Sequence, residues 1–187
     1  MLEKENTGYT RIAKWLHWSM AFIWMVSWGL GILATHWRDT LNPQHELTFL
    51  HKALASTLLL LIVARVTWRL KNPPPALPES MSALAKRGAM IGHILLYAIA
   101  LIALPLSGWY WSSVADKPIL VAGLFLLPPL VDPAPDLYDL AKYIHTWTSW
   151  FCGALIGEHL LVALKHHFVD KDNILAGMLP SKKRRVK

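Results

Sequence analysis

Four apolar windows constrain this chain more than any other feature of its sequence. They cover residues 15–35, 47–69, 91–114 and 145–168. Each is long enough to cross a hydrocarbon core of roughly 30 Å as an α-helix, which takes about 20 residues. Of the 187 residues, 54% are hydrophobic and only 17% are charged, a balance too apolar for an ordinary soluble domain. The sequence therefore predicts an all-α integral membrane protein, a single domain over residues 1–187 built as a four-helix bundle.

Lysine and arginine fall unevenly on the segments between these windows. Three precede residue 15, five lie between residues 65 and 87, and seven lie from residue 165 onward; the other two connections hold only Arg38, Lys52, Lys117 and Lys142. The positive-inside rule then predicts that both termini face the cytoplasm. The terminal "SKKRRVK" and the net charge of +7 are expected to contact anionic membrane lipid, with no nucleic acid as a partner.

The connections fit the same plan. A fifth apolar stretch, residues 119–131, is short and contains Pro128 and Pro129, so we expect it to lie at the membrane interface without spanning. In the cytoplasmic connection a proline-rich segment precedes "ESMSALAKRGAM", which is expected to form a short amphipathic helix leading into the third window. Fourteen largely polar residues precede the first window, which we therefore expect to be retained and not cleaved as a signal peptide.

Histidines inside the windows fall at two depths. His17 and His159 are near the predicted cytoplasmic side, whereas His51 and His145 are near the outer side. The fourteen residues from His145 to His159 bring a helix to within about 40° of four full turns and span about 21 Å, so both imidazoles share one face. Two opposed imidazoles at each of two depths is the ligand set of two b-type haems.

Other readings of these histidines are weaker. A single buried histidine is usually satisfied by a neighbouring hydroxyl or carbonyl, but four at matched depths favour ligation. Zinc needs three or four ligands at one point. Cys152 is the only cysteine, which excludes a C-x-x-C-H site for covalent haem. Spacing alone does not decide whether His159 or His166, two turns later on the same face, opposes His17.

Several polar residues near the cytoplasmic ends have more than one reading. Arg65 and Arg69 are placed to contact haem propionates or a quinone. They are equally consistent with basic residues at a helix end that only set the orientation of the span in the membrane. His93 is placed to hydrogen-bond a propionate or a quinone carbonyl, or to be satisfied by a neighbour. Glu158, beside His159, is the one acidic residue in the fourth window and has no evident role.

The chain resembles the bacterial cytochrome b561 proteins, small four-helix di-haem cytochromes that include superoxide:ubiquinone oxidoreductases. The resemblance covers nearly the whole chain and is carried, in order, by these elements: "AKWLHWSMAF", "FLHKALASTLLLLIVARVTWRL" followed by "PPP", "GHILLYAIALIALPLSGW", "HTWTSW" with "GEHLLVALKHHF", and "DKDNILAGMLP". It implies that His17 and His159 ligate the cytoplasmic-side haem and that His51 and His145 ligate the outer one. It also places His166 near a quinone.

The resemblance implies a multi-pass protein of the bacterial inner membrane. It would carry electrons between an outer-side donor, such as superoxide, and ubiquinone or another quinone. Two non-covalent b haems are the expected cofactors. Two alternatives stay open: a haem-bearing membrane anchor and electron conduit for a partner oxidoreductase subunit, and a haem-free transporter or structural bundle whose histidines move protons or bind metal.

Overall fold

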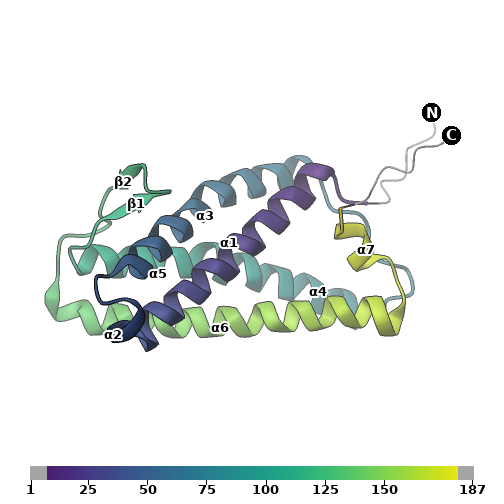
Figure 1. The fold of residues 1–187 in the computed structure, drawn as a ribbon. Helices are drawn as coiled ribbons and strands as arrows, with labels where there is room; N and C mark the ends of the chain where they lie inside the picture. Colours follow the sequence, from purple (N-terminus) through teal and green to yellow (C-terminus); the bar gives the residue numbers. More distant parts are fainter. Residues whose placement is uncertain (1–7, 181–187) are drawn as a thin grey trace.

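Four long helical rods run side by side in the computed structural model, which describes residues 8–180 (Figure 1). They form the all-α membrane bundle that the sequence predicts, and all four are long and apolar enough to cross a membrane. The rods are α1 (Arg11–His36), α3 (Glu46–Lys71), a composite of α4 (Ala83–Leu96), η1 (Tyr97–Ala103) and α5 (Leu104–Val114), and α6 (Tyr138–Lys165) with its continuation η3 (His166–Asp170).

Short elements close the two ends of the bundle. The helix α2 (Arg38–Leu41), the strands β1 (Ile119–Val121) and β2 (Phe125–Leu127) and the 3₁₀ turn η2 (Pro135–Leu137) lie at the end that we call the hairpin end. The helix α7 (Ile174–Met178) and the start of α1 lie at the opposite end, called here the α7 end (Figure 1). The basic tail 181–187 falls outside the described residues.

The third rod begins where a serine caps it. Ser82 Oγ accepts a hydrogen bond from the Ala85 backbone N–H at 3.2 Å, as an N-cap residue does. From Ala83 the helical backbone continues without a break to Val114. The amphipathic segment expected before the third window is therefore the first part of the same rod, and it has no separate end.

A π-helical segment interrupts that rod at its middle. It covers Tyr97–Ala103 and ends two residues before Pro105, which occupies the first turn of α5. Proline has no backbone N–H, and its ring clashes with the carbonyl four residues earlier, so regular α-helical bonding cannot pass through this point. The wider π turn accommodates the proline while the rod stays helical.

The apolar stretch 119–131 does not form a helix. Residues 119–127 of this stretch form an antiparallel hairpin in which Val121 pairs with Phe125. Residues 122–124 form its turn, and Ala122 and Gly123 adopt left-handed φ values of +52° and +74°. The Ala122 N–H also donates to Ala53 O at 3.1 Å, which ties the hairpin to α3.

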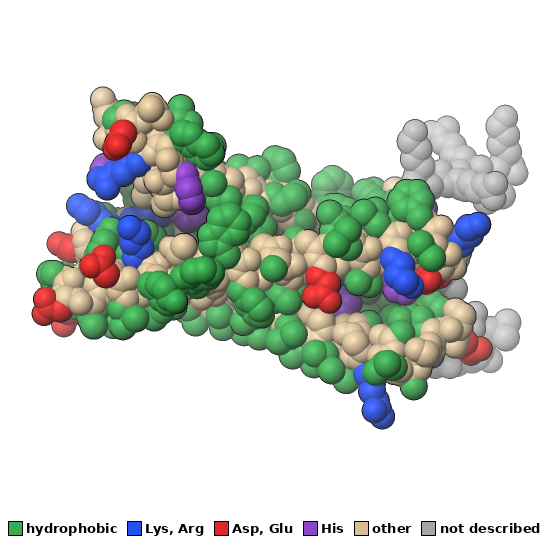
Figure 2. Space-filling view, turned by 90° about the horizontal axis from the view of Figure 1, so that it is seen from below, with side chains coloured by type: hydrophobic (Ala, Val, Ile, Leu, Met, Phe, Trp, Pro, Cys, Tyr) green, Lys and Arg blue, Asp and Glu red, His purple; other side chains and the backbone are tan. Residues whose placement is uncertain are grey.

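The outside of the bundle is apolar between its two ends. Hydrophobic side chains cover the middle of the face in Figure 2, and most charged side chains lie toward the ends. Inside, the core is small and lies midway along the rods. It consists of Met20, Trp24, Leu58, Ala100 and Cys152. A surface this apolar is stable in lipid, which matches the membrane location predicted from the sequence.

Candidate functional site

At the hairpin end, His51 of α3 and His145 of α6 face one another. Their ring centroids are 6.2 Å apart, and the ring planes are inclined by 72°. His51 Nδ1 lies 2.7 Å from Ser27 O, and because a carbonyl only accepts, this nitrogen carries the proton. Nε2 of His51 is then the nitrogen with a free lone pair, as a metal ligand requires.

The hydrogen bond of His145 selects the same tautomer. Its Nδ1 lies 3.0 Å from Ser107 Oγ, and that hydroxyl donates its own proton to Leu104 O at 2.8 Å. With its proton committed, Ser107 accepts from the histidine, so His145 Nδ1 is the donor and Nε2 is free. Both rings of the hairpin-end pair are therefore oriented by neighbouring oxygens.

Two glycines make room for these rings. A Cβ added to Gly31 would lie 3.1 Å from His51 Nδ1, and one added to Gly108 would lie 2.9 Å from His145 Cε1. Neither contact is one that a folded protein accommodates without moving the ring. Glycine at these positions lets α1 and α5 approach the imidazoles of α3 and α6.

At the α7 end, His17 of α1 and His159 of α6 form the second pair. Their ring centroids are 6.3 Å apart with the planes inclined by 71°. The structure thus opposes His17 with His159, where the spacing of the sequence left His166 as an alternative. His93 of α4 is also close, its centroid 5.5 Å from that of His159. Its Nδ1 donates to Ala89 O at 2.7 Å, so a neighbouring carbonyl satisfies that nitrogen.

Arg65 lies beside the second pair. Its guanidinium is close enough to His17 and His159 to interact electrostatically with both. One of its N–H groups donates to Ala13 O at 3.0 Å, which joins α3 to α1. Arg65 and Arg69 also line a shallow cleft between α1, α3 and η1.

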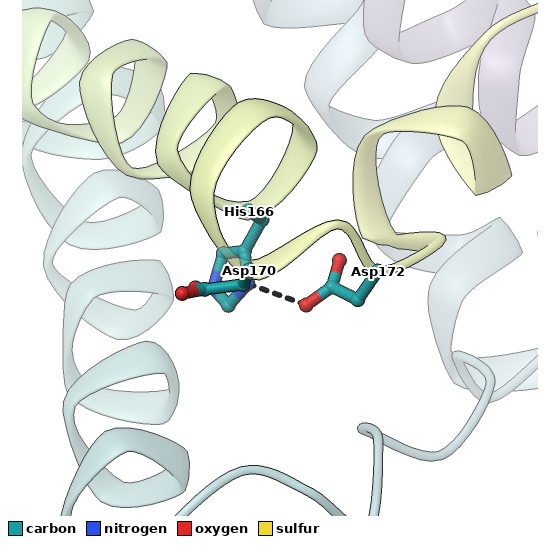
Figure 3. Close-up of side chains that lie close together, drawn as sticks. All are labelled: His166, Asp170 and Asp172. Carbon is teal, nitrogen blue, oxygen red and sulfur yellow. Dashed lines mark hydrogen bonds and ion pairs between the residues drawn. The ribbon is translucent and has the colours of Figure 1, made fainter.

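His166 belongs to a third cluster, at the start of η3. Its Nδ1 lies 2.6 Å from Asp172 Oδ2 and 3.2 Å from Asp170 Oδ2 (Figure 3). Both Asp170 oxygens contact Lys165 Nζ, at 2.6 and 2.7 Å. Glu158, by contrast, is exposed on α6 and forms no ion pair within residues 8–180.

The sequence did not single out several residues that build these sites. Two serines, Ser27 and Ser107, hydrogen-bond the rings at the hairpin end, and two glycines, Gly31 and Gly108, leave space for them. Asp172 hydrogen-bonds His166. Small and hydroxylated residues are common in membrane helices for packing alone, so their type gave no signal. Asp172 stands six residues beyond His166 across a change of chain direction, which no helical period anticipates.

Both pairs have the dimensions of imidazoles bound to opposite faces of one iron. With metal–nitrogen bonds of about 2 Å, two opposed imidazole centroids lie about 6.3 Å apart, against 6.2 and 6.3 Å here. Two buried polar atoms within the described chain lack a hydrogen-bond partner: Ser27 Oγ and Trp111 Nε1. Ser27 holds His51, and the Trp111 ring lies 5.7 Å from that of His145. These donors fit a cofactor that carries buried polar groups, as haem does.

Known proteins resemble this chain over most of its length. The family model described as prokaryotic cytochrome b561 matches residues 8–181. Cytochrome b561 homolog 2 of Escherichia coli is 36% identical over 175 residues, which cover 91% of this chain and 90% of that protein. Cytochrome b561 homolog 1 of the same species is 33% identical over 66% of this chain and 69% of its own.

A relative with a more specific name is more distant. The probable superoxide oxidase CybB of Yersinia pestis is 27% identical over 168 residues, which cover 90% of this chain and 93% of that protein. The family match spans all of the described residues, including every histidine of the two pairs. The chain is therefore a member of the prokaryotic cytochrome b561 family, bacterial membrane proteins that transfer electrons and contain haem b.

Proposed function

We propose that this chain is a di-haem cytochrome that carries electrons across the membrane from an outer-side donor to a quinone. His51 and His145 would hold one haem b, and His17 and His159 the other. The observation that carries the proposal is the geometry of the two pairs, with centroids 6.2 and 6.3 Å apart at opposite ends of one bundle. A haem held by two histidines would supply single-electron exchange.

The side chains around each pair have distinct tasks. Ser27 and Ser107 fix the His51 and His145 tautomers and so keep Nε2 available for the metal. Arg65 provides positive charge beside the second pair, where it would stabilise a propionate or contact the quinone. Between the pairs, the stacked rings of Trp24 and Trp28, 5.5 Å apart, fill the core and exclude water.

The charges of the described residues support one orientation of the bundle. Of the thirteen Lys and Arg residues within residues 8–180, nine belong to segments toward the α7 end, so this end would face the cytoplasm of a bacterial inner membrane. The hairpin end and its pair would then face the outer side. Electrons would enter near His51 and His145 and leave near His17 and His159, where a quinone dissolved in the bilayer can approach.

Superoxide is the donor that we propose, and ubiquinone or another quinone is the acceptor. The name of the Yersinia pestis relative supports the donor, and the resemblance noted in the sequence supports our proposal of a quinone near His166. The overall reaction consumes two superoxide anions, one quinone and two protons. It yields two molecules of oxygen and one quinol, which balances atoms, charge and electrons.

Haem content is the first test. In membranes of cells that express the chain, a reduced-minus-oxidised spectrum with haem counted against protein should give two b-type haems per chain. One haem per chain would exclude the di-haem arrangement, and none would exclude electron transfer by either pair.

Donor and acceptor are tested next with the purified holoprotein. Superoxide should reduce the haem at once, and added quinone should reoxidise it with formation of quinol. If the haem is reduced only after a partner oxidoreductase is supplied, the chain is a conduit subunit and the superoxide proposal is wrong.

A further inference from the structure

The contact between His166 and Asp172 is short and largely protected from water. Nδ1 and Oδ2 are 2.6 Å apart, and the two side chains are only 12% and 14% exposed. A charge-assisted hydrogen bond of this length is stronger than one between neutral groups. The carboxylate accepts, so His166 Nδ1 carries the proton and Nε2 is its second functional nitrogen. Within residues 8–180, Nε2 of His166 has no hydrogen-bond partner.

The backbone holds Asp172 in this position. Lys171 adopts the left-handed conformation, φ +54°, which is unfavourable for a residue other than glycine. This reverses the chain after η3, and the Asp172 N–H donates back to His166 O at 3.1 Å. The second carboxylate oxygen, Oδ1, accepts the Ile174 N–H at 3.0 Å. Three hydrogen bonds therefore fix the carboxylate against the imidazole.

The same cluster has the donor atoms of a cation site, yet its charges argue against one. Ligand atoms of His166, Asp170 and Asp172 all lie within 4.8 Å of one another. Lys165 Nζ, however, contacts both oxygens of Asp170, and a metal ion there would face this ammonium group. His166 and Asp172 already satisfy one another. The cluster is better suited to moving a proton than to holding a metal.

An aspartate on one imidazole nitrogen has a known electrostatic effect. The carboxylate fixes the tautomer and the orientation of the ring, so the other nitrogen is the one that exchanges protons with a neighbouring group. Reduction of a quinone to a quinol needs such a group, because each carbonyl oxygen gains a proton as electrons arrive. His166 lies at the α7 end, where our proposed function brings the quinone.

We propose that Asp172 is a positioning residue that makes His166 the proton donor to the quinone. This inference rests on the proposed function. In each of two rounds the His166 Nε2–H bond breaks, an O–H bond forms on the quinone, and the quinone takes one electron that originated on superoxide. His166 is left neutral, with its Nδ1–H still directed at Asp172. Water at this end of the bundle then returns a proton to Nε2.

The test compares two substitutions that change one oxygen to a nitrogen in the same cluster. Asp172→Asn keeps an amide oxygen to accept the Ile174 N–H, but it presents an NH₂ group to His166 and favours the wrong tautomer. Asp170→Asn makes the same chemical change in a side chain whose oxygens are both committed to Lys165.

Rapid mixing of the holoprotein separates the two half-reactions. Haem reduction by superoxide at the other end should proceed at the wild-type rate in both variants. Haem reoxidation by added quinone should slow about 10- to 100-fold in Asp172→Asn and change less than about twofold in Asp170→Asn. The solvent deuterium isotope effect on reoxidation should rise only in Asp172→Asn, because proton transfer has become limiting.

A second measurement, which does not depend on turnover, determines which nitrogen of His166 is protonated. In ¹⁵N-histidine-labelled protein, with His166→Gln used to assign the signal, Nδ1 of His166 should be the protonated nitrogen in the wild type and Nε2 in Asp172→Asn. Unchanged protonation, or an unchanged reoxidation rate in Asp172→Asn, would overturn the positioning role while the proposed function stands. If the wild-type haem is not reoxidised by quinone at all, the proposed function fails and this inference fails with it.

Discussion

His145 and His159 lie on the same face of α6, yet each meets a histidine from a different helix. His145 opposes His51 of α3, and His159 opposes His17 of α1. The two pairs therefore share one helix and no histidine. Loss of one histidine should remove one haem and leave the other in place.

Replacement of His145 by alanine tests this independence. His145→Ala should lose the hairpin-end haem, because one axial nitrogen is removed, and keep most of the signal of the second. His159→Ala should show the reverse. The measurement is haem per chain together with the two spectral components. Equal loss of both components in either variant would mean that the pairs are not separate sites.

A second prediction concerns Gly108, which lies beside the same pair. A Cβ at this position would lie 2.9 Å from His145 Cε1. Overpacking of this kind typically destabilises a folded protein by about 1–3 kcal/mol. Gly108→Ala should therefore weaken haem retention at the hairpin end, measured by titration of the apoprotein with haem. Gly88→Ala is the matched control, because its Cβ meets nothing within 4 Å. Equal retention in both variants would show that the ring has room to move.

Some of these residues were predictable from sequence, and some were not. The four paired histidines follow from helical period and depth, since both are properties of a single rod. Which side chains hold them depends on how the rods pack. Ser27 uses its backbone carbonyl, a group that every residue possesses, and Ser107 is selected by the rotation of α5. Arg65 was expected at the site, but its bond to Ala13 O was not.

At the scale of elements, the π-helical segment before Pro105 sets the direction of α5. A π turn inserts one residue relative to a regular α-helix, which rotates every later side chain by about 100°. Ser107 and Gly108, two of the residues beside His145, follow it in the first turns of α5. The sequence shows the proline but not how the helix accommodates it, so this rotation is evident only in the structure.

The short helix α7 is attached to α1 by two long-range bonds. Trp18 Nε1 donates to Met178 O and Lys14 Nζ donates to Leu179 O, both at 2.9 Å. These contacts join residues about 160 positions apart, beyond what any local sequence pattern predicts. Trp18 directly follows His17 in the chain, so α7 is attached to α1 next to the second pair.

Trp18→Phe tests that attachment. It removes one hydrogen bond worth about 0.5–1.5 kcal/mol, so amide exchange over residues 174–179 should accelerate about two- to tenfold. Trp15→Phe is the control, because that indole is 72% exposed and makes no hydrogen bond in the described part of the chain. Identical exchange in both variants would show that Trp18 does not hold α7.

At the scale of the whole molecule, the orientation in the membrane is open to a direct test. Leu124 in the hairpin turn and Leu84 near the start of α4 are each 81% exposed, at opposite ends of the bundle. The single native cysteine, Cys152, is fully buried. In intact spheroplasts a membrane-impermeant maleimide should therefore label Leu124→Cys and not Leu84→Cys, with both labelled after lysis. The opposite pattern would invert the bundle and place the basic segments outside.

Membrane class and the four spans could be predicted because hydropathy and charge act along each segment separately. The hairpin of residues 119–127 could not, because its strands are stabilised by pairing and by the bond from Ala122 to Ala53. An apolar run broken by prolines gives the same signal whether it lies flat at an interface or folds on itself.

Both histidine pairs take one member from α6, the last rod to leave the ribosome. A nascent chain with three rods inserted has His17 and His51 in place, without the α6 histidines that oppose them. Under the proposed function, haem would be captured only after synthesis has passed His145, and the second pair would be completed later still. Since a bound cofactor stabilises the state that binds it, we expect chains made during haem shortage to be less stable than chains that have bound haem.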